Sequence, residues 1–154
     1  MKLDRIDFEI LDTLQKNARI SNKDLAEANE ISPSTCLERV RRLRTAGVIE
    51  GYHAVVDPSV LGIAVQAMIS IRLRQHAKID FDALIEEMSQ AKEVVNVYLL
   101  AGDTDFLVHV AVKDVAHLRS VVVDNFTARY EVAHIDTALI FEYVKSPALP
   151  NYQS

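Results

Sequence analysis

Ser32-Pro33-Ser34-Thr35-Cys36-Leu37-Glu38-Arg39-Val40-Arg41-Arg42-Leu43-Arg44-Thr45-Ala46 is the stretch that decides the fold of this chain. Ser32 suits the position before a helix, because its side chain accepts a hydrogen bond from a first-turn amide. Pro33 fits the first helical position, which needs no backbone donor. Gly47 is the residue type that ends helices in a left-handed conformation. The stretch therefore predicts a short, well-capped helix.

This predicted helix has two faces of different chemistry. At about 100° per residue, one side gathers the apolar residues and the other the polar ones. The apolar set is Cys36, Leu37, Val40 and Leu43, and the outward set is Ser34, Thr35, Glu38, Arg41 and Arg42. Its arginines make the helix cationic, although the whole chain carries a net charge of −5. A capped helix with one apolar and one cationic face has the shape that fits a DNA groove. Because one copy would make few phosphate contacts, we expect at least two copies to act on one DNA.

Two further short helices precede this one. Residues 4–16 place apolar side chains at helical spacing after Asp4, a good N-cap. Ser21-Asn22-Lys23-Asp24 resembles a capping box that opens a second helix, and Asn29-Glu30-Ile31 forms the turn. Two helices separated by about four residues are typical of a helix-turn-helix. We predict a helix-turn-helix domain over residues 1–50, with 48–56 as a β-ribbon or extended strand that makes a possible wing.

The rest of the chain changes from helical to alternating periodicity. Asp57-Pro58-Ser59 and Gly62 mark a linker, so residues 51–63 are predicted as a β-ribbon and hinge. Residues 64–146 then read as strand, helix, strand, strand, helix, strand, the order of a ferredoxin-like βαββαβ domain. The strands fall at 65–73, 94–100, 106–112 and 132–144, and the helices begin near Phe81 and Val115. The predicted fold class is α+β, with a C-terminal tail at 147–154.

Composition narrows the class of protein further. No apolar run approaches the roughly 18 residues of a membrane span, and Met1-Lys2-Leu3-Asp4 does not open a signal peptide. The single cysteine, Cys36, suits a reducing cytoplasm, and its place on the apolar helix face predicts a buried thiol rather than a nucleophile. The histidines (His53, His76, His109, His117 and His134) lack close metal-ligand spacing. We expect no catalytic residues, no metal site and no cofactor.

Several motifs together resemble the Lrp/AsnC family of transcription regulators. In the N-terminal half they are Leu3-Asp4-Arg5-Ile6-Asp7, Asn17-Ala18-Arg19-Ile20-Ser21-Asn22, Ser32-Pro33 with Cys36-Leu37-Glu38-Arg39-Val40-Arg41-Arg42-Leu43, and Gly47-Val48-Ile49-Glu50-Gly51-Tyr52. In the C-terminal half the motif is Ala101-Gly102-Asp103-Thr104-Asp105-Phe106-Leu107. The run from Cys36 to Leu43 is most similar to the leucine-responsive branch. The resemblance implies a helix-turn-helix (winged-helix-like) domain joined to a ferredoxin-like effector and assembly domain.

The chain departs from the family pattern at two places. Asn29 and Glu30 stand where such proteins often carry an apolar residue and a glycine, and Tyr130-Glu131 replaces Pro-Gly before the last strand. A left-handed glutamate costs about 1 kcal/mol relative to glycine. We therefore expect the turn at Glu30 to have a different shape, and the loop near Tyr130 to differ as well.

The predicted DNA contacts lie on the helix that begins after Ser32. Arginines contact phosphates or guanine edges, and the first residues of a helix favour anions. Glu38 either accepts a hydrogen bond from a cytosine or pairs with Arg41 or Arg42 along the helix, and the second role is favoured. The predicted DNA-binding residues are Ser32, Ser34, Thr35, Glu38, Arg39, Arg41 and Arg42.

The turn from Gly102 to Asp105 has two interpretations. From its residues alone it is an ordinary hairpin turn, since glycine and aspartate dominate turns. The family resemblance implies instead that it lines a cleft between dimers where a free amino acid binds. Exposed amides would hold the ligand's carboxylate, Asp105 its ammonium group, and apolar residues an uncharged side chain. The implied effector residues are Leu99, Ala101, Gly102, Asp103, Thr104, Asp105, Ala138, Leu139 and Ile140.

The combined interpretation is a sequence-specific DNA-binding transcription regulator whose assembly or DNA affinity responds to an amino acid. Its expected partners are double-stranded DNA, the effector and further copies of the chain, as a homodimer that assembles to a tetramer or octamer. It would act in the cytoplasm, on the nucleoid, and not at a membrane. The alternatives are an architectural DNA-binding protein without an effector and a small enzyme on a ferredoxin-like scaffold.

Overall fold

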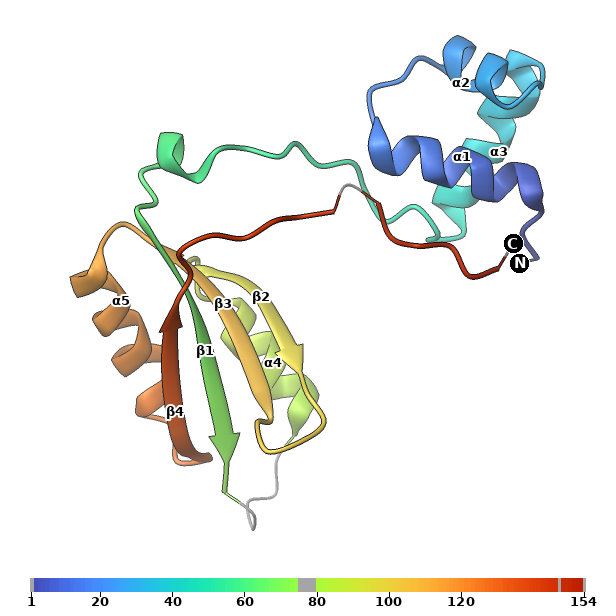
Figure 1. Ribbon diagram of the computed structural model, residues 1–154. Helices are drawn as coiled ribbons and strands as arrows, with labels where there is room; N and C mark the ends of the chain where they lie inside the picture. The colour runs from blue at the N-terminus through green and yellow to red at the C-terminus, as the bar shows by residue number, and fades with distance from the viewer. Residues whose placement is uncertain (1, 75–79, 147, 154) are drawn as a thin grey trace. The chain divides into compact units, whose positions relative to one another are not determined.

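The computed structural model describes residues 2–74, 80–146 and 148–153, and it divides the chain into two compact units (Figure 1). The first unit comprises Met1–Val55 with Val144–Ser154, and the second comprises Val56–Tyr143. His76, Met1 and part of the expected tail at 147–154, namely Pro147 and Ser154, lie outside the described residues.

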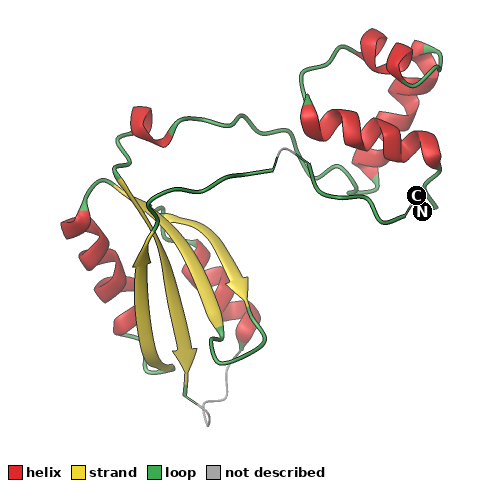
Figure 2. Ribbon diagram, viewed as in Figure 1, coloured by secondary structure: helices red, strands yellow, loops and turns green. Residues whose placement is uncertain are grey.

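Three short helices form the first unit (Figure 2). They are α1 (Arg5–Lys16), α2 (Asn22–Ala28) and α3 (Pro33–Thr45). Each begins at a side chain that accepts a hydrogen bond from the first turn: Asp4, Ser21 and Ser32 respectively. These caps satisfy donors that have no partner inside the helix, so each short helix starts at a defined residue. The three predicted helices are confirmed.

The core of the first unit lies between the helices. It consists of Ile10, Leu25, Ala26, Cys36 and Leu43, all buried. Leu37 was expected on this apolar face, but its side chain is 61% exposed. That expectation is wrong because Leu37 lies about 100° around the helix from the buried Cys36, at the flank of the packed face.

The turn between α2 and α3 keeps a left-handed residue. Glu30 has a φ of 53°, so the expectation of a differently shaped turn is wrong. Two backbone hydrogen bonds hold this geometry, from the Glu30 amide to the Glu27 carbonyl at 3.1 Å and from the Ile31 amide to the Ala26 carbonyl at 3.0 Å. The buried side chain of Asn29 adds a third, because its Nδ2 donates to the Leu25 carbonyl at 2.7 Å. At the other end of α3, Gly47 takes the expected left-handed φ of 71°.

Residues 48–56 form no strand, contrary to the predicted β-ribbon. A ribbon needs a second strand for its backbone hydrogen bonds, and the described part of the chain brings none beside this segment. The segment leads to a 3₁₀ turn, η1 (Pro58–Leu61), which Gly62 ends with a φ of 75°. The residues at 57–62 that were predicted to mark a linker therefore form a tight turn.

The second unit is a four-stranded antiparallel sheet with helices on one face. Its strands are β1 (Val65–Leu73), β2 (Val94–Leu99), β3 (Phe106–Val112) and β4 (Val132–Leu139), in the order β2-β3-β1-β4. Helices α4 (Phe81–Ser89) and α5 (Val115–Val122) lie behind the sheet in Figures 1 and 2, and a π-turn, η2 (Val123–Thr127), extends α5. The predicted ferredoxin-like βαββαβ order is confirmed.

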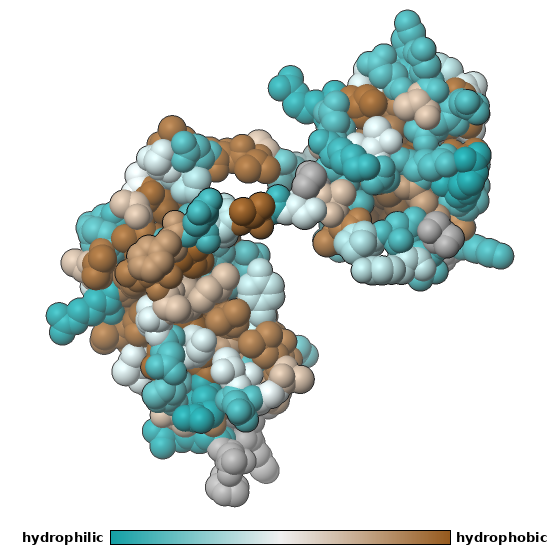
Figure 3. All heavy atoms as spheres, viewed as in Figure 1, coloured by the Kyte–Doolittle hydropathy of each residue, from teal (hydrophilic) through white to brown (hydrophobic). Residues whose placement is uncertain are grey.

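The alternation along the strands separates a buried sheet face from an open one. Every second residue of β1 and β3 packs under the helices, including Ile69, Phe106 and Val108, which are wholly buried. Their neighbours Met68, Leu107 and His109 point to the other face, which neither of the described helices of this unit, α4 and α5, covers. Figure 3 views the second unit from this open side, where hydrophobic and hydrophilic side chains mix. The two-residue period of the sequence thus places each side chain on its face.

None of the helices in the described ranges is long and apolar enough to cross a membrane.

Candidate nucleic-acid interface and effector surface

The start of α3 carries three hydroxyl groups close together. The Oγ of Ser32 accepts a hydrogen bond from the Thr35 amide at 3.1 Å. It also lies 3.0 Å from the Oγ of Ser34 and 2.8 Å from the Oγ1 of Thr35. All three side chains are exposed at the positive end of the helix dipole. The structure therefore brings these predicted residues together in a geometry suited to a phosphate oxygen.

Further along α3, the exposed surface is set by Glu38 and Arg41. Both are exposed, and neither forms an ion pair with another of the described residues. The favoured pairing of Glu38 with Arg41 or Arg42 is therefore wrong: Arg42 turns toward α1 instead. This leaves Glu38 and Arg41 available to an external partner on the same side as Ser34.

Arg39 and Arg42 bind two aspartates at the start of α1, its N-cap Asp4 and Asp7 in its first turn. The Nη1 of Arg39 donates to both carboxylate oxygens of Asp4, at 2.9 and 2.8 Å, and to Oδ1 of Asp7 at 2.8 Å. The Nη2 of Arg42 donates to both oxygens of Asp7, at 2.8 and 2.7 Å. Asp7 is wholly buried, whereas the side chains of Arg39 and Arg42 are 21% and 47% exposed. These contacts fix α3 onto α1.

Asp4 and Arg39, two members of this cluster, have shifted pKa values. The Asp7 backbone N–H, followed by the Arg39 guanidinium, lowers the pKa of the Asp4 carboxyl. Hydrogen bonds to Asp4 and then Asp7 raise the pKa of Arg39. Arg39 was predicted as a DNA contact, but its charge is neutralised inside the domain. The DNA contact of Arg39 stays a prediction, and we leave Arg39 out of the proposed DNA surface.

Sequence reasoning missed the role of Asp7, although a signal existed. Leu3, Asp7, Ile10 and Leu14 recur at the spacing of one helix face, so Asp7 occupies a position where an apolar residue is normal. A carboxylate at such a position requires partners, because a buried unpaired charge is strongly unfavourable. The arginines of α3 were the cations available to meet that requirement.

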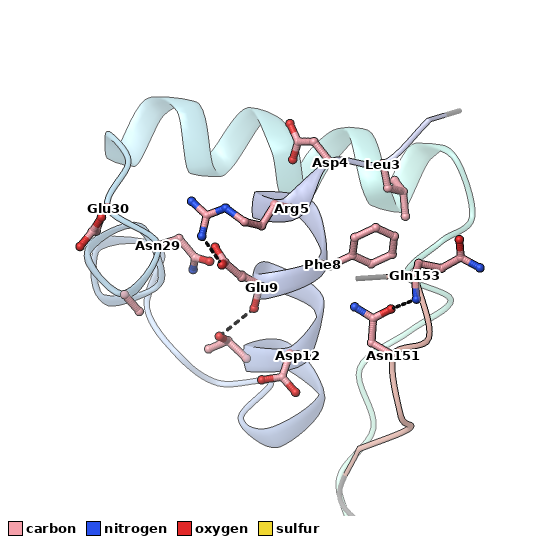
Figure 4. Close-up of a pocket in the computed structure, with 12 residues that line it drawn as sticks. Leu3, Asp4, Arg5, Phe8, Glu9, Asp12, Asn29, Glu30, Asn151 and Gln153 are labelled. Carbon is pink, nitrogen blue, oxygen red and sulfur yellow. Dashed lines mark hydrogen bonds and ion pairs between the residues drawn. The ribbon is translucent and has the colours of Figure 1, made fainter.

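Figure 4 shows a cavity of about 980 Å³ in the same unit, between the outer side of α1, the α2–α3 turn and the C-terminal residues. Asp4, Glu9, Asp12 and Glu30 line it, and Arg5 forms an ion pair with Glu9 there. Excess acid makes this cavity a poor site for phosphate. A second hollow, of about 800 Å³, follows α3 beside Leu37 and Arg41 and includes Tyr52, over which Arg44 stacks at 5.9 Å.

In the second unit, the turn from Gly102 to Asp105 closes the β2–β3 hairpin. Gly102 has a φ of 138°, which favours glycine. The Asp105 amide donates to the Ile71 carbonyl at 3.0 Å. The Oδ2 of the Asp105 side chain accepts from the Leu73 amide at 2.7 Å. One carboxylate oxygen of Asp105 is thus engaged in the fold and the other has no bond to the described residues. Gly102 and Asp103 are exposed, as an anion-binding turn requires.

The sheet does not bring all predicted effector residues together in one chain. Leu99 lies on the edge strand β2, in the row of Phe106 and Ile71, whereas Leu139 lies on the opposite edge strand in the row of Ala67. The two rows lie four residues apart along β1, which is roughly 13 Å. The two edge strands lie three strand spacings apart across the sheet, which is roughly 14 Å. Ala138 and Ile140 flank Leu139. A site containing both groups needs a second copy of the chain.

The remaining reactive side chains have structural surroundings. Cys36 is buried, as predicted, and burial raises the pKa of its thiol. His109 lies 2.9 Å from the Oε1 of Gln66 on the open sheet face, and desolvation lowers its pKa. The Nε2 of His117 lies 3.0 Å from the Oε1 of Glu93. Within the described ranges, no three histidine, cysteine, aspartate or glutamate residues are grouped to hold a metal ion.

Comparison with known protein families gives two matches that follow the division into units. A winged helix-turn-helix DNA-binding model matches residues 3–50, and an Lrp/AsnC ligand binding domain model matches residues 66–149. The HTH-type transcriptional regulator AldR of Mycobacterium tuberculosis is 43% identical over 147 residues, covering 96% of this chain and 82% of that protein. The leucine-responsive regulatory protein of Escherichia coli is 35% identical over 143 residues, covering 93% and 87%. Similarity to AldR thus exceeds that to the leucine-responsive branch, to which the Cys36–Leu43 run had pointed.

Solved structures agree with these matches. A crystal structure of MtbAldR has a TM-score of 0.81 and 40% identity, and covers 96% of this chain and 97% of its own. A transcriptional regulator from Neisseria meningitidis, solved as a complex with L-Met, has a TM-score of 0.82 and 29% identity, with 94% of both chains covered. The likeness therefore spans both units.

Proposed function

Since this chain belongs to the Lrp/AsnC family of DNA-binding transcription regulators, which is not a family of enzymes, we propose that it recognises specific DNA sites by placing α3 in the major groove. An amino acid bound to the second unit changes that recognition. Acting on chromosomal DNA places the protein in the cytoplasm, on the nucleoid.

The exposed face of α3 carries the proposal. Its capped start offers hydroxyls and the Ser34 amide to a phosphate, since Pro33 has no N–H and Ser32 already accepts from the Thr35 and Cys36 amides. Glu38 and Arg41 follow on the same side without partners among the described residues. A guanidinium can bind the O6 and N7 of guanine with two hydrogen bonds, and a glutamate can accept from cytosine. The proposed contacts are Ser32, Ser34, Thr35, Glu38, Arg41 and Arg42.

Assembly follows from the open sheet face. Met68, Leu107 and His109 lie on a sheet face that α4 and α5 leave uncovered, so a second copy is the partner that would bury it. Two copies also double the phosphate contacts of a helix that carries few charges. We propose a homodimer that packs sheet to sheet and assembles further, to a tetramer or octamer.

The effector is proposed to be a free amino acid. The Lrp/AsnC ligand binding domain model covers the second unit, and the related regulator from Neisseria meningitidis was solved as a complex with L-Met. Exposed amides at Gly102 and Asp103 suit a carboxylate, and the uncommitted oxygen of Asp105 suits an ammonium group. Leu99 on one copy and residues 138–140 on another would complete the site.

Substituting Arg41 tests the DNA surface. A duplex recovered from random DNA by selection with the full chain serves as the specific site, and a scrambled duplex as the non-specific one. Arg41→Ala should weaken binding to the selected duplex by roughly 5- to 150-fold, the equivalent of about 1–3 kcal/mol for a lost bidentate contact. Fluorescence anisotropy measures both affinities.

Arg119→Ala is the matched control, because it removes the same charge from an exposed position on α5. It should leave the affinity for the selected duplex unchanged. Equal affinities of the wild-type protein and Arg41→Ala would contradict the groove assignment.

A further inference from the structure

Arg42 is held in place by the buried carboxylate of Asp7, and this arrangement bears on DNA recognition. The Asp7 oxygens accept hydrogen bonds from Arg42, from Arg39 and, through Oδ2, from the Asp4 amide at 3.1 Å. Every bond to Asp7 comes from a group fixed in a helix or a cap. The carboxylate therefore cannot rotate without breaking several bonds at once.

Arg42 gives only one of its terminal nitrogens to this contact. Its Nη2 bonds to Asp7, while its Nε and Nη1 form no bond to the described residues, and its side chain is 47% exposed. A guanidinium is a planar fork of five donors, so fixing one corner fixes the direction of the others. Arg42 follows Arg41 on α3, next to the surface proposed to enter the groove.

We propose that Asp7 is a positioning residue for DNA recognition: it pre-orients the guanidinium of Arg42 so that its free N–H groups meet the DNA. The inference rests on the proposed function of α3. A side chain that is already ordered loses less freedom on binding, which is the general advantage of pre-organisation. Arg39 stays behind as the fixed counter-charge, because Asp4 and Asp7 both hold it.

The charges of the cluster sharpen the inference. The negative charges of Asp4 and Asp7 balance the positive charges of Arg39 and Arg42. Arg42 therefore presents N–H donors in a fixed direction, while the cluster adds little net positive charge. Arg41 has no acidic partner among the described residues and presents a full charge. Arg42 therefore contributes to specificity through geometry, and Arg41 contributes more to the salt dependence of binding.

Asp7→Asn tests this division of roles. Affinities for the selected and scrambled duplexes are measured by fluorescence anisotropy over a series of salt concentrations. Asn keeps the shape of Asp7 but loses its charge and its ability to hold two arginines. We expect affinity for the selected duplex to fall about tenfold, while affinity for the scrambled duplex stays equal or rises because the domain gains positive charge. A merely structural loss would lower both affinities together.

Asp12→Asn is the matched control, since it removes the same charge from an exposed position on the same helix, where Asp12 pairs with Lys16. Its ratio of selected to scrambled affinity should equal that of the wild-type protein. The double variant Asp7→Asn with Arg42→Ala should bind the selected duplex no more weakly than Arg42→Ala alone. The inference would be overturned if the losses of affinity from Asp7→Asn and Arg42→Ala multiplied in the double variant. It would also be overturned if Asp7→Asn left the ratio of selected to scrambled affinity unchanged.

Arg42→Lys keeps the test decisive if Asp7→Asn unfolds, which circular dichroism reports. Lysine retains the charge but lacks the planar fork, so it should lose affinity for the selected duplex at an unchanged salt slope. Wild-type affinity of Arg42→Lys would overturn the inference. If Arg41→Ala weakens selected binding but the Asp7 and Arg42 variants behave as wild type, only the positioning role fails. If no duplex is selected, or Arg41→Ala binds as wild type, the proposed function fails and the inference with it.

Discussion

Glu30 adopts a backbone conformation that costs free energy in the folded state. Its φ of 53° is the one positive value at a non-glycine position in the described ranges, and it turns the chain from α2 into α3. Glycine takes this conformation without a steric penalty, whereas an L-residue with a Cβ pays about 1 kcal/mol. The capping hydrogen bonds at Glu30 and Ile31 offset this cost.

Glu30→Gly should therefore stabilise the protein. We expect the free energy of unfolding to rise by about 0.5–1 kcal/mol, part of the gain being lost to the greater freedom of glycine in the unfolded chain. Urea unfolding followed by circular dichroism measures the change. Gly47→Ala is the reverse control: its φ is 71° and nothing lies within 4 Å of the added Cβ, so only conformational strain lowers stability there. A destabilised Glu30→Gly would contradict this account of the turn.

Individual residues were predictable where their role depends on near neighbours. The caps at Asp4, Ser21 and Ser32 follow from residues three positions away, and the structure has all three. The bond between Asp7 and Arg42 joins residues 35 positions apart, so no local pattern specifies it. The bonds of Arg39 to Asp4 and Asp7 were unpredictable for the same reason, because the partners of a charged helix residue are unknown until the neighbouring helix is placed.

At the scale of elements, strand alternation fixed the sheet faces and helical spacing fixed the helices, since both depend on side-chain direction within a few residues. The segment 48–56 was predicted as a ribbon because its residues suit a strand, but strand formation needs a neighbour. Likewise, the distance between Leu99 and Leu139 depends on strand order, and the order β2-β3-β1-β4 is a long-range property. The family resemblance therefore implied the candidate effector residues without showing how far apart they lie in one chain.

The β2–β3 turn is the element that an effector would engage. Isothermal titration calorimetry with each common amino acid should show heat for at least one, and that ligand should change the oligomer mass and the DNA affinity. Asp105→Asn should abolish this heat, because the amide removes the negative charge that holds the ligand's ammonium group while its oxygen can still accept from Leu73. Asp103→Asn is the control and should retain binding.

Absence of heat with every amino acid, together with unchanged oligomer mass and DNA affinity, would contradict the effector proposal. That result would favour the alternative of an architectural DNA-binding protein without an effector.

At the scale of the whole molecule, the chain combines a small cationic surface with a net negative charge. Charge alone would therefore steer it away from DNA, and specific binding has to come from a few well-placed contacts repeated in several copies. The ordered start of α3, the free Arg41 and the fixed Arg42 supply such contacts. The open sheet face supplies the means of bringing copies together.

The central claim is that α3 lies in a DNA groove, and site-directed cleavage tests it most directly. Cys36 is buried with a raised pKa, so a thiol-reactive iron chelate would couple selectively to an exposed cysteine introduced by Ser34→Cys. Coupled protein on the selected duplex should cut at two clusters of nucleotides separated by about one helical turn, roughly 10 base pairs or a multiple of it, as for two recognition helices. Glu86→Cys on α4, in the second unit, provides the comparison. Cleavage from position 86 with none from position 34 would contradict the account.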